Sequence, residues 1–173
     1  MIDAHVHLEK GPYTKEWLDQ FINVALERKI KKVYFLEHTH VFKEFNFLYN
    51  EVKNYNEYQK KWFARKKRKA KSIYEYLNFI EKMKKYKFPI KIKFGLEVCY
   101  SPKYEKEIKM YKEKYPLDIM VGAVHSIDGW AFDHKKQPWS CKDYDMRSIY
   151  GRYYELLIQM ANSGLFEGMS HPN

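Results

Sequence analysis

Short apolar segments of this chain end in histidines and carboxylates, the side chains that bind divalent metal ions. The groups are Asp3-Ala4-His5-Val6-His7, Glu37-His38-Thr39-His40, Gly95-Leu96-Glu97, Val124-His125 and Ser170-His171-Pro172. His5 and His7 are two residues apart, so on a regular strand both imidazoles leave the same face and can reach one ion. Such a pair is weak evidence alone, but the groups that follow strengthen it. The sequence therefore predicts a hydrolytic metal centre.

Glu97 is the most informative carboxylate because it lies near the end of the apolar segment Ile90–Val98. A carboxylate buried there needs a compensating charge. A lysine partner is one alternative. In the other, Glu97 bridges two ions about 3.5–4 Å apart, and a shared water loses a proton near neutral pH and attacks a phosphorus or carbonyl centre. No Ser-His-Asp order or nucleophile elbow competes with this chemistry.

The segments that must position these groups alternate between short apolar runs and amphipathic helices. Predicted strands cover Met1–Ala4, Lys32–Leu36, Phe88–Val98, Leu117–Val124 and Leu165–Ser170. Predicted helices run from Thr14 to about Arg28, over about Tyr58–Lys85, over Tyr104–Lys114 and from Asp143 or Asp145 to about Asn162. This alternation favours an α/β fold with parallel strands, whose carboxyl ends meet at one edge. No linker or repeat divides the chain, so we expect a single domain over residues 1–173.

The positive charge of the chain is concentrated in one segment. Residues 53–87 contain thirteen Lys or Arg and three Glu, which accounts for the formal net charge of +10. Apolar residues recur there at near-helical spacing, so a long amphipathic helix with a solvated basic face is the favoured interpretation. A patch that attracts anionic substrates or nucleic acid is the alternative, with nucleic acid the less expected partner.

Composition excludes several other classes of protein. Hydrophobic residues make up 45% of the chain and aromatic residues 18%, which argues against disorder. No apolar run approaches the roughly 20 residues that cross a bilayer, so no membrane association is expected. The two cysteines, Cys99 and Cys141, form no C-x-x-C pair. A reducing, cytoplasmic location is therefore expected.

The ordered motifs resemble those of the polymerase and histidinol phosphatase (PHP) domain family, most closely its histidinol-phosphatase branch. The resemblance spans the chain and implies a distorted β/α barrel with two or three divalent ions, zinc, iron or manganese. The ligands it implies are His5, His7, His38, Glu97, His125 and His171. The implied reaction is hydrolysis of a small phosphorylated substrate, histidinol phosphate, in histidine biosynthesis.

The sequence departs from the family pattern in two places, and each departure changes what we expect of the metal site or the barrel. Where the family has a further ligand after its first motif, this chain has Tyr13, and Glu9 is the candidate substitute. The closing Asp-x-His motif of the family is absent before Asn173. We therefore expect an incomplete barrel of about five strand–helix units that lacks the last ones, with self-association as one way to complete it.

Residues outside the ligand set complete the predicted site. His40 and Asp133 are candidates for proton donation or substrate contact, with surface or capping roles as the alternative. The preferred prediction is a metal-dependent phosphomonoesterase of the histidinol-phosphatase type. The alternatives are a catalytically silent metal-binding domain and a related metal-dependent nuclease, for which the basic segment is the support.

Overall fold

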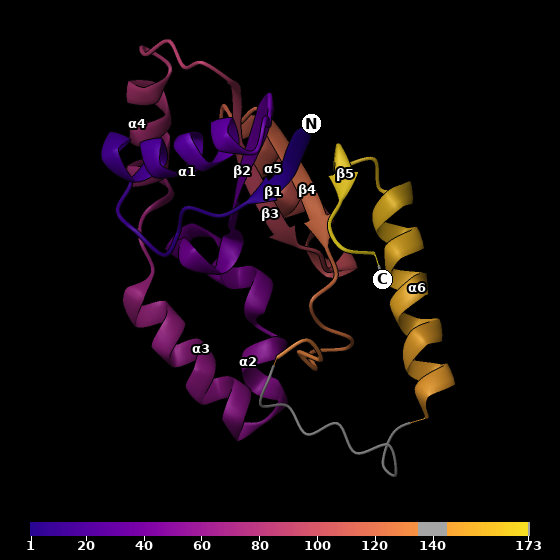
Figure 1. Ribbon diagram of the computed structural model, residues 1–173. Helices are drawn as coiled ribbons and strands as arrows, with labels where there is room; N and C mark the ends of the chain where they lie inside the picture. The colour runs from indigo at the N-terminus through magenta and orange to yellow at the C-terminus, as the bar shows by residue number, and fades with distance from the viewer. Residues whose placement is uncertain (135–144, 173) are drawn as a thin grey trace.

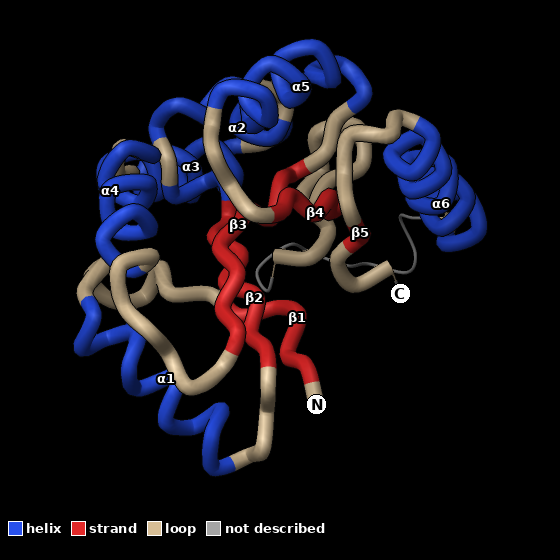
Figure 2. Tube along the Cα trace, turned by 90° about the horizontal axis from the view of Figure 1, so that it is seen from above, coloured by secondary structure: helices blue, strands red, loops and turns tan. Residues whose placement is uncertain are grey.

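The computed structural model describes residues 1–134 and 145–172, which form a curved parallel sheet with helices on its outer side (Figure 1). The five strands are β1 (Ile2–Val6), β2 (Lys32–His38), β3 (Lys91–Cys99), β4 (Ile119–Ala123) and β5 (Gly168–Met169). They pair in the order β1-β2-β3-β4-β5, and every pairing is parallel. Seen from above, the strands follow an arc with the helices around it (Figure 2). The predicted α/β half-barrel is confirmed.

The helices follow the strands along the chain, as the alternation predicts. They are α1 (Lys15–Glu27), α2 (Val52–Tyr55), α3 (Glu57–Lys69), α4 (Ile73–Met83), α5 (Glu105–Lys114) and α6 (Met146–Asn162). The Thr14 side chain caps α1 and the Asp145 side chain caps α6, each accepting from a backbone N–H of the first turn. Asp145 is one of the two predicted caps for the last helix, and the other, Asp143, lies outside the described residues.

The prediction of one long helix through the basic segment is wrong. Three helices replace it because two polar side chains begin new helices within it. Asn56 caps α3 by accepting from Gln59 N, and Ser72 forms a capping box with Glu75 at the start of α4. Between α3 and α4, Lys71 forms an isolated bridge with Phe42. The break separates α3, which carries most of the charge, from α4, which packs into the core.

The edge strands differ from their predicted bounds. β1 extends to Val6 instead of Ala4, and an irregularity in its pairing with β2 lies between Asp3 and Val6. β5 is reduced to Gly168–Met169 because its register with β4 covers those two residues. Irregularities of this kind re-aim the side chains of an edge strand. Both differences lie beside histidines of the predicted centre.

The core lies between the sheet and the helices. Leu18 and Ile22 of α1 are buried against it, as is Tyr76 of α4. The Tyr76 hydroxyl lies 3.3 Å from the carbonyl oxygens of both Phe35 and Gly95, on two neighbouring strands. The helices thus fix the strands whose ends carry the site. Among the described residues, no helix is long and apolar enough to span a membrane.

Candidate metal centre

The predicted ligands come together at the carboxyl edge of the sheet. His7 follows β1, His38 ends β2, Glu97 lies near the end of β3, and His125 and His171 follow β4 and β5. His38 and Glu97 are partners in the β2–β3 register, which places neighbouring strand ends side by side. Parallel strands bring their carboxyl ends to one edge, so residues separated by up to 166 positions can meet there.

Glu97 is the centre of this arrangement. Its carboxylate is buried, and five imidazole Nε2 atoms lie within 3.6 Å of it. Its Oε2 lies 3.2 Å from His5, 3.6 Å from His7 and 3.2 Å from His38. Its Oε1 lies 3.3 Å from His125 and 2.7 Å from His171. Histidines thus take the place of the lysine partner that the alternative interpretation required.

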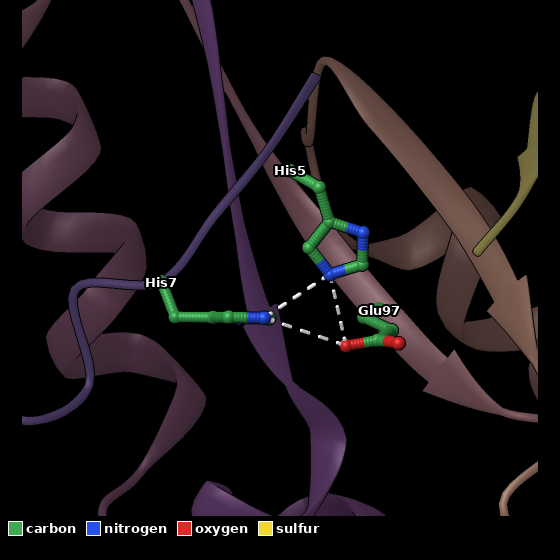
Figure 3. Close-up of side chains that lie close together, drawn as sticks. All are labelled: His5, His7 and Glu97. Carbon is green, nitrogen blue, oxygen red and sulfur yellow. Dashed lines mark hydrogen bonds and ion pairs between the residues drawn. The ribbon is translucent and has the colours of Figure 1, made fainter. Parts of the chain in front are cut away.

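The distances among the ligand atoms of His5, His7 and Glu97 fit three ligands of one ion. Bonds of ~2.0–2.1 Å at tetrahedral angles put two ligand atoms about 3.3–3.4 Å apart. His5 Nε2 lies 3.1 Å from His7 Nε2 and 3.2 Å from Glu97 Oε2, and the three atoms face one another (Figure 3). Two neutral imidazoles this close need a shared proton or a shared cation. The donor set, imidazole nitrogen and carboxylate oxygen, suits zinc, iron or manganese.

Three groups of side chains could each hold an ion. They are His5, His7 and Glu97; His7, Glu9 and His38; and Glu97, His125 and His171, with the ligand atoms of each group within 4.8 Å of one another. Glu97 belongs to two groups, one through each oxygen. That arrangement is the one a bridging carboxylate requires.

Electrostatics supports ligand chemistry at these side chains. Burial raises the pKa of Glu97, but hydrogen bonds from His125, His171 and His5 outweigh it and hold that pKa well below the usual range. Burial and the neighbouring His38 lower the pKa of His7 to about 4, which leaves its imidazole neutral. Burial lowers the pKa of His125, but contacts with Cys99 and Glu97 raise it to about 10, so an ion there would displace a proton.

Glu9 lies at the place where the sequence predicts a substitute ligand. Its Oε2 accepts from His38 Nδ1 at 2.8 Å and from the His38 backbone N–H at 3.2 Å. Burial raises the pKa of Glu9, and the hydrogen bond from His38 reverses this and lowers it to about 2. An ionised Glu9 fixes the His38 ring so that Nε2 faces Glu97.

Glu37 has a different role from its neighbour His38. It is buried, and it accepts from the Leu8 backbone N–H at 2.6 Å and from the Tyr13 hydroxyl at 2.8 Å. Burial raises the pKa of Tyr13 well above its usual range, so the phenol remains a donor. Tyr13, which stands where the family has a further metal ligand, thus ties the loop after β1 to Glu37 in β2. Glu37 belongs to none of the three candidate metal groups.

His40 and Asp133 line a cavity of about 890 Å³ that His38 and His125 also line. His40 Nε2 lies 4.0 Å from Glu9 Oε1, and burial and the charge of Lys66 lower the pKa of His40 to about 3. Asp133 acts on His125 through its charge, which raises the pKa of that imidazole. Both residues therefore border the centre without belonging to the three candidate metal groups.

Lys66 lines the same cavity from α3 and was not among the predicted site residues. Its Nζ donates to His40 Nε2 at 2.8 Å. Its spacing from Gln59 and Phe63 could have indicated that Lys66 faces the protein, because these three positions share one helix face.

Comparison with known proteins agrees with the ordered motifs. Residues 3–172 match the PHP domain model. A protein of Deinococcus radiodurans named probable histidinol-phosphatase is 30% identical over 80 residues, which are 46% of this chain and 31% of that protein. The match thus covers less than a third of that relative. Since the domain model covers nearly all of the chain, from Asp3 to Pro172, the chain belongs to the PHP domain family.

Proposed function

We propose that this chain forms the centre of a metal-dependent phosphomonoesterase holding two or three ions of zinc, iron or manganese. The proposed ligands are His5, His7, His38, Glu97, His125 and His171, with Glu9 as a further candidate. Bound ions would supply a water of lowered pKa and stabilise negative charge on the phosphate.

One observation carries the proposal: a single buried carboxylate is surrounded by five imidazoles from four other strand ends. The two oxygens of a carboxylate offer about four lone-pair sites to donors, so five histidines are more than hydrogen bonding to Glu97 alone can use. The separations of their Nε2 atoms from Glu97 match those of ligands sharing an ion.

Residues around the centre would orient a ligand, hold the loop after β1 and donate a proton. Glu9 orients the His38 ring, and Glu37 with Tyr13 holds the loop that carries His7 and Glu9. Asp133, in the cavity beside His125, is the proposed donor of a proton to the leaving group. The cavity of about 890 Å³ is within the size range of small-molecule sites, which supports a small phosphorylated substrate.

Histidinol phosphate is the candidate substrate, and histidine biosynthesis the candidate pathway. Support comes from the order of the motifs and from the name of the Deinococcus radiodurans relative. The reaction would cleave the phosphate ester and release inorganic phosphate.

The test is phosphate release from histidinol phosphate by protein loaded with manganese or zinc. Glu97→Gln and His125→Ala should lower kcat by at least about 100-fold, because each removes a ligand. Glu81→Gln, an exposed carboxylate on α4, serves as the matched control and should leave the rate unchanged. An equal rate in the Glu97 and Glu81 variants would refute the assignment. Bound metal without turnover in the wild-type protein would instead identify a catalytically silent domain.

A metal-dependent nuclease is the second candidate, because basic and aromatic side chains of α3 line the cavity. Arg65, Arg68, Lys69 and Trp62 lie there, and such a combination suits single-stranded nucleic acid. Salt-sensitive binding and cleavage of a single-stranded oligonucleotide, both lost in Arg65→Glu/Arg68→Glu, would favour it. Hydrolysis of histidinol phosphate without oligonucleotide binding would exclude it.

A further inference from the structure

Lys66 is placed on the side of α3 that faces the protein. Gln59 and Phe63, seven and three residues before it, are buried, and Lys66 is itself partly buried. Positions with this spacing share a helix face, where apolar side chains are the rule. Burial lowers the pKa of Lys66, which reflects the cost of removing its ammonium group from water. A lysine at this position needs a compensating partner.

His40 is the partner that the structure provides, and it carries no negative charge. An ammonium group only donates, so the His40 Nε2 that lies 2.8 Å from Nζ must accept. The ring proton of the neutral imidazole is then on Nδ1, and Nε2 has no proton to give. His40 therefore holds Lys66 in place instead of donating through that nitrogen. Within residues 1–134 and 145–172, no Asp or Glu forms an ion pair with Lys66.

The cavity in front of Lys66 reaches the candidate metal centre. His38 and His125 line it, and the rings of His38 and His40 are 5.0 Å apart. Arg65, Arg68 and Lys69 add positive charge to its α3 side. Such a cavity attracts anions and concentrates them near its wall.

We propose that Lys66 binds the phosphate group of the substrate, donating from Nζ to a non-bridging phosphate oxygen while His40 fixes its position. The inference rests on the proposed phosphomonoesterase and adds a substrate-binding residue to it. One of the three N–H groups of Lys66 is used by His40, which leaves two for the phosphate. Glu9 acts on the Lys66 ammonium through its charge but forms no ion pair with it, so a phosphate dianion would be the direct anionic partner.

Two substitutions separate the charge of Lys66 from its packing, and its neighbour provides the control. Lys66→Met keeps the length of the side chain and removes the charge. Lys66→Gln also keeps a donor for His40. Lys67→Met removes an equivalent charge from the exposed side of α3, outside this cavity. Each protein is loaded with manganese, and its metal content and thermal unfolding are measured first.

Two readouts are then compared. One is the Kd of inorganic phosphate by calorimetry, and the other is the split between KM and kcat on p-nitrophenyl phosphate. We expect both Lys66 variants to bind phosphate about 10- to 100-fold more weakly, the range for a charge-assisted hydrogen bond, with KM raised and kcat nearly unchanged. Lys67→Met should stay within about twofold of wild type.

Phosphate affinity equal to wild type in Lys66→Met would overturn the proposal. So would recovery of that affinity in Lys66→Gln, because it would show that the hydrogen bond to His40, and not the charge, matters. If Lys66→Met fails to fold, the glutamine variant decides alone. Absence of turnover in the wild-type protein would refute the phosphatase assignment, whereas the calorimetry would still test Lys66.

Discussion

Replacing Glu37 with glutamine should remove a specific pH dependence of folding stability. Burial raises the pKa of Glu37 from 4.5 to about 7, although hydrogen bonds from Leu8 and Tyr13 act to lower it. Between these values the unfolded chain loses the proton and the folded chain keeps it. Raising the pH through this interval therefore destabilises the wild-type protein. Glutamine can accept from Leu8 and donate to Tyr13, and it does not titrate.

The size of the stability loss follows from the difference between the two pKa values of Glu37, in the unfolded and the folded chain. At about 1.4 kcal/mol for each pH unit between 4.5 and about 7, the wild-type protein should lose about 3 kcal/mol relative to Glu37→Gln. Stability at low pH is the reference, because both states of the wild-type protein are protonated below 4.5. The loss should be complete slightly above pH 7.

Urea unfolding of both proteins in a metal chelator, followed by tryptophan fluorescence from pH 4.5 to 7.5, measures this directly. Other titrating groups affect both proteins alike, so the difference in free energy of unfolding isolates Glu37. A difference that stays constant across the range would refute the assignment of a raised pKa. A difference that changes in the opposite direction would show that Glu37 is buried as a stabilised anion.

Further predictions concern packing and metal binding. In Gly95→Ala the new Cβ would lie 2.2 Å from the Ile119 carbonyl oxygen, so urea unfolding should show a loss of about 2 kcal/mol or more; no loss would contradict this close approach of β3 and β4. In Gly151→Ala in α6 the new Cβ meets no described residue beyond its own helix turn within 4 Å, so the variant should gain about 0.5–1 kcal/mol in the same assay, whereas a loss would contradict its open surroundings. Manganese at 100 times its Kd should stabilise the fold by about 2.7 kcal/mol, seen as a higher Tm than in chelator; an equal Tm would argue against a native-state metal site.

The strand pattern and the meeting of the candidate ligands at one edge could be predicted because both follow from local sequence. Parallel strands bring their carboxyl ends to one edge, so a polar residue after each apolar run is placed there without knowledge of the packing. His38 and Glu97 illustrate this, since their meeting in the β2–β3 register follows from the strand order. The predicted bounds of β1 and β5 differ from the structure because edge pairing depends on a single neighbour.

The division of the basic segment and the roles of Glu37 and Lys66 could not be predicted in the same way. A capping box at Ser72 is visible in the sequence, but the near-helical spacing of apolar residues continues through it. Glu37 precedes His38 in the motif, yet successive residues of a strand face opposite sides, so its partners come from the loop after β1. The contact of Lys66 with His40 depends on how α3 packs over the sheet.

We propose that Glu97 would hold metal ions at the carboxyl edge of the sheet, as a member of two of the three candidate metal groups. Elemental analysis after manganese loading and desalting tests it most directly, with Glu97→Gln and the exposed control Glu81→Gln measured beside wild type. Wild type and Glu81→Gln should each retain two or three ions per chain, and Glu97→Gln should retain at most about one, because both groups that share its carboxylate lose a ligand. Equal metal content in all three proteins, or none in wild type, would contradict the claim.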